Sequence, residues 1–294
     1  MHTTLPAVAT APDVRAGIAG WIARHPIAAF LTWLFTVGQA IAFTPLLVDV
    51  PVPNQVFIVA TSVLGLFLPA VVITWITDGR EAAVRFLRRF VDWRVAPRWY
   101  VMALLVVPVV AIALAWLILG APPAMSPGVW VDALISGFVL SFVLTLVPNN
   151  WVEEGAWSGF VQARLQNRYA PAMAAIIVAP FFALQHVSLV ADNPLPLVAL
   201  VMIGLAVVMI PYRMLTGWMW NRTGSLLLLG FLHAAGNAVA SGSGFDGGLL
   251  RKLYPDDLMT AGMLHMIAYA VVGIVVLVAT RGRLGLRRTE AGDR

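Results

Sequence analysis

Long apolar runs dominate the pattern of positions along the chain, and eight of them approach the length of a membrane span. A transmembrane helix needs about 20 consecutive, mainly apolar residues. The eight runs cover Ile27–Val48, Gln55–Thr77, Trp99–Leu119, Val131–Val147, Ala172–Val190, Pro196–Tyr212, Ser225–Ala240 and Met259–Thr280. The pattern therefore predicts an all-α fold, a polytopic transmembrane helical bundle of about eight spans.

The segment Asp78–Arg98 differs from the runs on either side of it. Its arginines alternate with apolar residues such as Phe86, Leu87 and Phe90. This pattern is typical of a basic amphipathic helix that lies on the membrane surface. A loop that fixes the topology by its charge alone fits the same sequence, and the pattern does not separate the two.

The composition indicates an integral membrane protein, in which the net positive charge is explained by membrane topology. Hydrophobic residues make up 60% of the chain and charged residues 11%, with a mean hydropathy of +0.86. Soluble domains carry about 25% charged residues. The basic residues cluster between apolar runs, as topology signals do, so the charge does not indicate a nucleic-acid partner. The chain has no cysteine, which excludes disulfides and thiolate chemistry.

The basic residues also predict the orientation and the domain limits. Of the 19 Lys and Arg, all but Arg251 and Lys252 fall in loops and tails of one side when eight spans are counted. Positive loops face the cytoplasm, so both termini are expected there. We expect a flexible cytoplasmic tail over residues 1–26, a single transmembrane domain over 27–281 with its core at about 131–240, and a second cytoplasmic tail over 282–294.

Strongly polar residues are rare inside the later runs, and their types suit the activation of water. Glu153 and Glu154 follow the fourth run, His186 lies late in the fifth, and His233 and Asn237 share the seventh. Ionisable groups in a bilayer are costly and usually face a protein interior or a water-filled cavity. Because three helices each carry such a group, we expect them to meet in one site, in the cytoplasmic half of the membrane.

Each of these residues also has a purely structural interpretation. The two glutamates could be a solvated pair at a helix end, and His186 could be a hydrogen-bonded structural histidine. His233 and Asn237 share one helix face at spacing i, i+4, so they could simply join two helices.

The chemistry of one carboxylate, two imidazoles and a carboxamide points to hydrolysis. A glutamate can act as a general base on water. Two imidazoles can hold a zinc-like ion that acidifies bound water. Alternatively, a histidine and Asn237 can donate hydrogen bonds to the oxyanion of a tetrahedral intermediate. The residues alone leave the metal form and the oxyanion form open.

Three motifs resemble those of the CAAX protease and bacteriocin-processing family of intramembrane proteases, also called the abortive-infection family. The family pattern is Glu-Glu-x-x-x-Arg, Phe-x-x-x-His and His-x-x-x-Asn/Asp, each on a different helix. The matching residues here are Glu153-Glu154, Phe182-x-x-x-His186 and His233-x-x-x-Asn237.

The resemblance implies an intramembrane endopeptidase with Glu153, Glu154, His186, His233 and Asn237 as catalytic residues. In a metal form, His186, His233 and Asn237 would bind a divalent ion, with zinc expected. The implied partners are the lipid bilayer and a membrane-associated peptide or protein substrate. The arginine-rich, alanine-rich composition is typical of a bacterium of high genomic GC, so the bacterial plasma membrane is the expected location.

The chain departs from the family pattern at Ser158, where the family has arginine. An arginine at i+4 would pair with Glu154, and a serine cannot supply that charge. Another arginine could take the role, with Arg164, Arg213 and Arg222 as candidates. Otherwise the chain is a catalytically impaired relative that acts by interaction, for example as an immunity protein. A transporter that uses the polar residues to move protons or cations is a third hypothesis.

Overall fold

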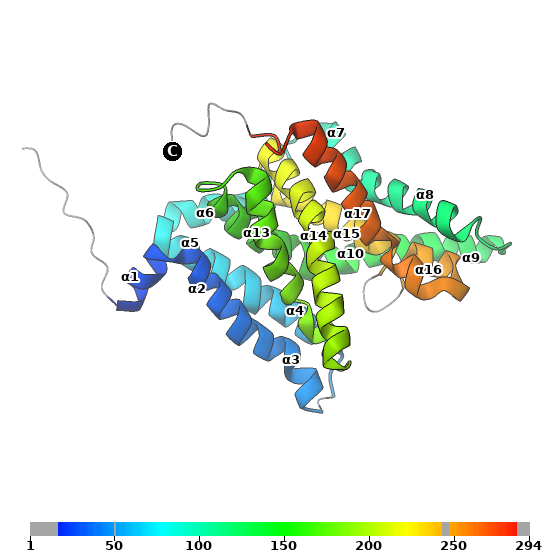
Figure 1. The fold of residues 1–294 in the computed structure, drawn as a ribbon, viewed down its shortest axis with the longest axis horizontal. Helices are drawn as coiled ribbons and strands as arrows, with labels where there is room; N and C mark the ends of the chain where they lie inside the picture. The colour runs from blue at the N-terminus through cyan, green and yellow to red at the C-terminus, as the bar shows by residue number, and fades with distance from the viewer. Residues whose placement is uncertain (1–16, 50, 243–246, 287–294) are drawn as a thin grey trace, which may run out of the picture.

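The computed structural model describes residues 17–49, 51–242 and 247–286, and all regular structure in this part of the chain is helical (Figure 1). Six helices are long and apolar enough to cross a membrane, and two shorter apolar helices join them. The six are Pro26–Leu47, Asn54–Asp78, Pro97–Leu119, Pro127–Leu165, Leu195–Thr223 and Pro255–Thr280, and the two are Pro171–Leu184 and Leu226–Val239. The eight helices correspond to the eight apolar runs, so the predicted helical membrane bundle is confirmed.

Several spans are continuous helices in which α-helical pieces alternate with wider π-helical turns. In lipid each backbone N–H and C=O group must be satisfied within the protein, which favours an unbroken helix even at proline. The pieces of the first three spans are α2 (Pro26–Trp33), η1 (Leu34–Gly38) and α3 (Gln39–Leu47); α4 (Asn54–Ala60), η2 (Thr61–Phe67) and α5 (Leu68–Asp78); α7 (Pro97–Val101), η3 (Met102–Val106) and α8 (Val107–Leu119). The fourth span contains α9 (Pro127–Asp132), η4 (Ala133–Leu140), α10 (Ser141–Thr145), η5 (Leu146–Asn150), α11 (Trp151–Glu154), η6 (Gly155–Gln162) and α12 (Ala163–Leu165).

The remaining helices complete the chain in sequence order. They are α1 (Gly17–Arg24), α6 (Arg80–Phe90), α13 (Pro171–Leu184), η7 (Val187–Leu189), α14 (Leu195–Thr223), α15 (Leu226–Val239), α16 (Leu249–Leu253), η8 (Pro255–Asp257) and α17 (Leu258–Thr280). The predicted tails and the glycine-rich stretch Ser241–Gly248 lie partly outside the described residues.

Three predicted boundaries near the polar residues are wrong. The fourth span does not end at Val147, because the π-helical turn η5 takes in Pro148 and the helix continues to Leu165. The fifth ends at Leu184 rather than Val190, and the sixth continues past Tyr212 to Thr223. These shifts place Glu153, Glu154 and Arg213 in helix interiors instead of at helix ends.

The basic segment after the second span forms the helix α6, as the amphipathic interpretation predicted. Ala83, Phe86 and Phe90 are buried on one face, while Arg85 and its neighbouring arginines point outward. The ring of Phe90 lies edge-on to those of Phe67 and Phe86, with centroids 5.3 and 5.5 Å away. The helix is therefore anchored by aromatic packing while its charged face stays exposed.

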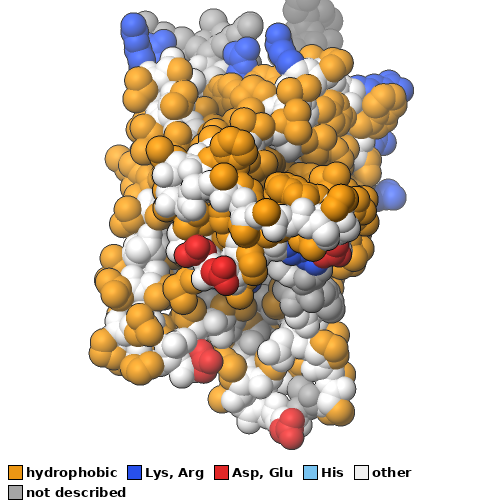
Figure 2. Space-filling view, turned by 90° about the vertical axis from the view of Figure 1, so that its right-hand side faces the viewer, with side chains coloured by type: hydrophobic (Ala, Val, Ile, Leu, Met, Phe, Trp, Pro, Cys, Tyr) orange, Lys and Arg blue, Asp and Glu red, His pale blue; other side chains and the backbone are white. Residues whose placement is uncertain are grey.

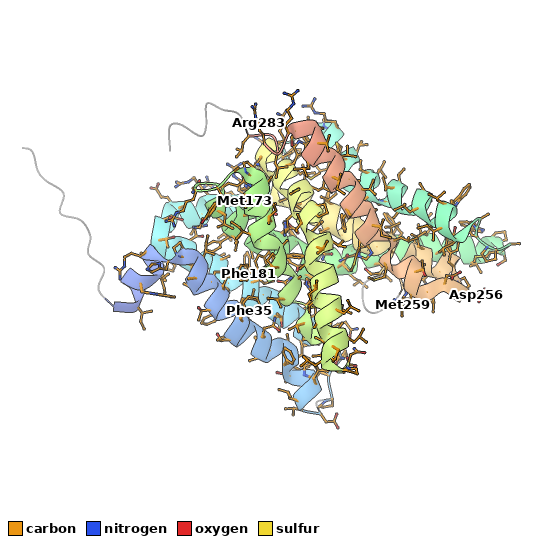
Figure 3. All side chains as sticks on the ribbon, viewed as in Figure 1. Phe35, Met173, Phe181, Asp256, Met259 and Arg283 are labelled. Carbon is orange, nitrogen blue, oxygen red and sulfur yellow. The ribbon has the colours of Figure 1, made fainter. Side chains whose placement is uncertain are left out.

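The centre of the bundle is α15, on which most side chains are buried. Gly230 lies against Trp151 of α11, and Gly236 lies beneath the ring of Tyr269 of α17. A side chain at either glycine would collide with its neighbour, so the small residues allow close helix approach. At the periphery, Phe35 and Phe181 join the first span to α13 with ring centroids 6.4 Å apart (Figure 3).

Charged residues divide the surface into two ends. On the face drawn in Figure 2, Lys and Arg gather mainly at one end and Asp and Glu lie toward the other. Figure 3 shows the same division along α17, with Asp256 near its start and Arg283 beyond its end. Large apolar side chains cover the exposed faces between the ends, for example Leu117, Ile203 and Val278. This surface suits lipid, and the protein is an integral membrane protein.

Candidate active site

Glu153 and Glu154 lie in the interior of the fourth span and are both buried. Their exposures are 3% and 0%. Twelve residues separate Glu153 from the end of the helix at Leu165, which corresponds to about 18 Å of helix rise. The hydrocarbon core of a bilayer is about 30 Å thick. Glu153 therefore lies nearer to Leu165 than to Pro127 in this 39-residue helix, and Leu165 marks the end that the predicted topology places on the cytoplasmic side.

Glu154 is held by a buried guanidinium. Nη2 of Arg213, on α14, donates to Oε2 of Glu154 at 2.6 Å, and both side chains are fully buried. The hydroxyl of Tyr212 donates to the other carboxylate oxygen at 2.6 Å. The hydroxyl of Ser158 donates to Oε2 at 2.6 Å. Both oxygens of Glu154 are thus occupied by fixed donors.

Arg213 reaches Glu154 from α14 and also contacts Ser158, the residue at the position of the family arginine. Its Nη2 contacts the hydroxyl oxygens of Ser158 at 2.6 Å and Thr216 at 2.5 Å. Its guanidinium carbon lies 4.9 Å from the ring centre of Phe182 and 5.0 Å from that of Tyr212. Of the three candidate arginines, Arg213 is the one that contacts Glu154. Arg164 instead forms an ion pair with Asp78.

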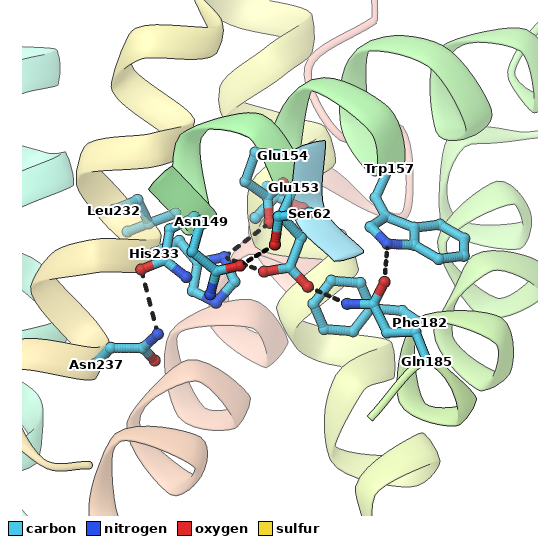
Figure 4. Close-up of polar contacts among 12 residues, drawn as sticks. Ser62, Asn149, Glu153, Glu154, Trp157, Phe182, Gln185, Leu232, His233 and Asn237 are labelled. Atoms are coloured by element: carbon cyan, nitrogen blue, oxygen red, sulfur yellow. Dashed lines mark hydrogen bonds and ion pairs between the residues drawn. The ribbon is translucent and has the colours of Figure 1, made fainter. Parts of the chain in front are cut away.

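Glu153 has a different environment, in which no Lys or Arg of the described residues forms an ion pair with it (Figure 4). Its Oε1 accepts a hydrogen bond from the side-chain amide of Gln185. Nε2 of His186 lies 3.6 Å from Oε1, and Nδ1 of His233 lies 3.8 Å from Oε2. Both separations are longer than a direct hydrogen bond and can be bridged by water. The structure thus places one imidazole near each carboxylate oxygen of Glu153.

The two histidines are positioned by backbone contacts. Nδ1 of His186 lies 2.9 Å from the carbonyl oxygen of Phe182, which can only accept, so Nδ1 carries the proton. The other nitrogen, Nε2, is then free to accept in the neutral ring. His186 lies just beyond the end of α13, and Phe182 walls one side of its ring at 5.2 Å. The main chain at His233 is held by a neighbouring helix, because the hydroxyl of Tyr269 on α17 donates to the carbonyl oxygen of His233 at 3.0 Å.

Nδ1 of His233 faces both carboxylates without a hydrogen bond of its own. It lies 3.3 Å from Oε1 of Glu154, but the angles are not those of a hydrogen bond, and this buried atom has no such partner among the described residues. The nitrogen is therefore available to a water molecule or to a substrate oxygen. Its exposure to solvent is low, since the side chain is 10% exposed.

Asn237 shares a helix face with His233, but its side chain forms a hydrogen bond with Asn150. Its side-chain amide donates to Oδ1 of Asn150 at 3.3 Å. Asn150 is 1% exposed, and its own Nδ2 has no hydrogen-bond partner among the described residues. No side-chain hydrogen bond between Asn237 and the glutamates or histidines is present in the described part of the chain. Asn237 and Asn150 instead form a carboxamide pair beside the site.

Gln185 is the main site residue that the sequence did not single out. Nε1 of Trp157 donates to its Oε1 at 2.7 Å, which turns the amide group of Gln185 toward Glu153. The amide nitrogen of Gln185, Nε2, also lies 3.4 Å from Nε2 of His186. The backbone of Gln185 is fixed by Gln39, whose side chain donates to its carbonyl oxygen at 2.9 Å. The only signal in the sequence was a polar residue beside His186 within an apolar run.

The site contains residue types that bind zinc-like ions, but these residues are not arranged as a metal site. Imidazole nitrogens and a carboxylate are ordinary zinc ligands, and the tautomer of His186 leaves one nitrogen free for a metal. However, no group of three or more His, Asp or Glu side chains in the described ranges is arranged to hold a metal ion. Asn237, the third ligand expected, is bonded to Asn150. The placement does not fit the predicted metal site, and we derive no step through a metal.

Comparison with known proteins gives one result for this region. Residues 135–239 match a family model described as type II CAAX prenyl endopeptidase Rce1-like. The matched segment contains all three motifs and ends just after Asn237, so the predicted resemblance to the CAAX protease family is confirmed. No curated protein and no solved structure matches the chain.

Proposed function

Because residues 135–239 carry the pattern of the Rce1-like CAAX endopeptidases, we propose that this membrane protein is an intramembrane endopeptidase in which Glu153 activates water. The observation that carries the proposal is that the two glutamates have different partners. Glu154 is neutralised by Arg213, whereas Glu153 faces two imidazoles at distances that a water molecule can bridge. A buried carboxylate without a paired cation is costly, and such groups are often functional.

The proposed reaction begins with a water molecule bound to the carboxylate of Glu153. Glu153 removes one proton as the water oxygen bonds to the carbonyl carbon of the substrate peptide. The carbonyl oxygen becomes an oxyanion, for which His233 and Asn237 are the proposed donors. The C–N bond then breaks, and the proton held by Glu153 passes to the departing amine. His186 would help to hold the water through Nε2, which now lies 3.4 Å from the side-chain amide of Gln185.

Arg213 supports an active enzyme over an impaired relative. The departure from the family at Ser158 was the main argument for impairment, because Glu154 would lack its arginine. Here Arg213 supplies that guanidinium from another helix, and Ser158 provides the space and one hydrogen bond. Glu154 then has the positive partner that the family pattern provides, which favours the catalytic interpretation.

A metal-dependent form is a second candidate, favoured by one observation. The proton on Nδ1 of His186 leaves Nε2 as a ligand, the usual tautomer of a metal-binding histidine whose other nitrogen bonds a backbone carbonyl. In that form His186, His233 and Asn237 would bind a divalent ion, with zinc expected, and Asn237 would have to leave Asn150. The ion would supply a more acidic bound water.

The substrate we propose is a membrane-associated peptide or protein tail. The glutamates lie inside a helix that is long and apolar enough to cross a membrane, and the most exposed ionisable group of the site is His186, with a side-chain exposure of 29%. A substrate segment that enters the bilayer can reach this depth without crossing an aqueous barrier. We place the protein in a bacterial plasma membrane with both termini in the cytoplasm. Reporter fusions after Arg98 and after Gly248 should report opposite sides, and the same side for both would refute this topology.

The test of the catalytic role compares membrane peptides in cells that produce the parent protein, Glu153→Gln or Glu81→Gln. Glu81 is an exposed carboxylate on α6 and serves as the matched control. New peptide N-termini found by proteomics should be present with the parent and the control and absent with Glu153→Gln. Loss of a general base typically costs about 10²–10⁴-fold in rate. Unchanged cleavage by Glu153→Gln would refute the proposal.

A further inference from the structure

A cavity of about 710 Å³ lies at the arginine-rich end of the bundle, away from the glutamates. It is bordered by the junction of α1 and α2, the end of α5, one face of α6, and α12 with the loop that follows it. These are the ends of the first, second and fourth spans. The cavity therefore opens where the spans leave the membrane, and the proposed function does not use it.

Four arginines and one aspartate line this cavity, which makes it strongly positive. The arginines are Arg24, Arg85, Arg164 and Arg168, and the aspartate is Asp78. Asp78 is already bound by Arg164, which also stacks on the ring of Phe160 with its guanidinium carbon 4.0 Å from the ring centre. One charge is thus neutralised, and the other three arginines remain.

The three remaining arginines have little compensation from nearby carboxylates. Arg85 lies 3.6 Å from Glu81, but both side chains are largely exposed, at 66% and 93%. Such pairs contribute very little. Within the described ranges, neither Arg24 nor Arg168 has a carboxylate partner. Guanidinium groups in this state are well suited to bind phosphate, because their planar donors match its oxygens.

The floor of the cavity is apolar, which distinguishes it from a simple basic patch. Phe86 and Leu165 line it with side chains that are only 8% and 9% exposed, and Ile27 and Ala163 are among the other apolar residues of the lining. The cavity therefore offers a positive rim and a hydrophobic base at the level of the membrane surface. A ligand that matches both parts carries a negative headgroup and a hydrocarbon portion.

We propose that this cavity binds the headgroup of an anionic phospholipid, with the phosphate between Arg24, Arg85 and Arg168 and the first carbons of the acyl chains on the apolar floor. Basic residues next to a membrane surface attract anionic lipids by about 1 kcal/mol each. A free phosphate ion would satisfy the arginines but would leave the apolar floor in water. The volume is also within the range of pockets that enclose small ligands.

The bound lipid would join elements that also surround the candidate site. Phe86 and Gly159 both line the cavity, and Gly159 directly follows Ser158, which donates to Glu154. The ring of Phe86 lies 3.1 Å from the position that a Cβ of Gly159 would occupy. Headgroup binding would therefore hold α6 against the helix that carries the glutamates.

The experiment uses the full-length protein in neutral detergent micelles with increasing mole fractions of phosphatidylglycerol or phosphatidylcholine. Lipids retained by the protein are counted by native mass spectrometry, and the half-saturating mole fraction is compared. We expect phosphatidylglycerol to bind preferentially. Arg85→Gln and Arg168→Gln should each raise the half-saturating fraction by about fivefold. Arg80→Gln, on the exposed surface of the same helix and outside the cavity, is the matched control and should leave it unchanged.

Three results would overturn the proposal. Equal binding of the two lipids would mean that the cavity does not recognise an anion. An equal loss with Arg80→Gln would mean that diffuse surface charge, rather than this cavity, attracts the lipid. Displacement of phosphatidylglycerol by inorganic phosphate at matched ionic strength would assign the site to a soluble phosphate. All three variants replace exposed side chains, so the fold is expected to persist in each of them, and cleavage activity is not needed as a readout.

Discussion

The buried pair between Arg213 and Glu154 gives a prediction that can be tested without knowing the substrate. Arg213→Met keeps the length and apolar character of the side chain but removes its charge. Glu154 would then remain fully buried with only the hydroxyls of Tyr212 and Ser158 as donors. The unpaired carboxylate should destabilise the folded protein.

The expected size of this effect follows from the geometry. Both side chains have no exposed surface, and their closest atoms are 2.6 Å apart. Removing one partner of such a buried pair typically costs about 3–5 kcal/mol, because the other charge is left uncompensated. At roughly 2 °C per kcal/mol for a chain of this size, the unfolding midpoint should fall by about 6–10 °C.

A relocation of the charge makes the test specific. Ser158→Arg alone should also destabilise, because it adds a second guanidinium to a closely packed space; overpacking alone costs about 1–3 kcal/mol. In the double variant Ser158→Arg/Arg213→Met, the guanidinium group is at position 158, four residues after Glu154, and position 213 no longer carries one. The double variant should therefore recover most of the stability lost in Arg213→Met.

The assay is thermal unfolding of the purified protein in one detergent, followed by intrinsic tryptophan fluorescence or by aggregation of the unfolded chain. Arg213→Met with an unchanged midpoint would refute the buried pair. If Ser158→Arg alone proved more stable or more active than the parent, Arg213 would not be the substitute for the family arginine. A double variant no better than the worse single variant would show that the position of the charge is not interchangeable.

Three further predictions follow from contacts around the site. Trp157→Phe keeps an aromatic ring but removes the donor that orients Gln185 toward Glu153. Cleavage should therefore fall, by less than in Glu153→Gln, while the protein level stays unchanged. Cleavage equal to that of the parent would show that this hydrogen bond does not position Glu153. Gly155→Ala should destabilise by about 1–3 kcal/mol, because its Cβ would collide with an aromatic ring of α6, whereas Gly204→Ala meets nothing within 4 Å and should be neutral in the same unfolding assay. Chelation before a cleavage assay should leave activity intact if the oxyanion form is right, and a loss restored by zinc would establish the metal form instead.

The sequence alone determined the class of the fold because its evidence is local. Each apolar run satisfies its own backbone by forming a helix and needs no knowledge of its neighbours. The alternation of arginine with apolar residues was compatible with the amphipathic helix α6 and equally with a loop, and the structure decided for the helix. The motif residues and their order carried the resemblance to a protease family, and that resemblance is confirmed over residues 135–239.

The sequence was less reliable about where helices end. Pro148, with two asparagines after it, reads as a break, yet a π-helical turn carries the helix through it. In lipid an exposed helix end costs more than a distorted turn, and neighbouring helices decide which one forms. The depth of the glutamates and the burial of Arg213 both depend on those extended helices.

Only the tertiary structure decided which side chains hold each glutamate. Adjacent positions on a helix point about 100° apart, so the sequence indicated that Glu153 and Glu154 have different partners but not which ones. Arg213 lies 59 residues from Glu154 along the chain, and Gln185 lies 32 residues from Glu153. Such pairings arise from the packing of one helix against another, and no local pattern encodes the distance between two side chains on separate helices.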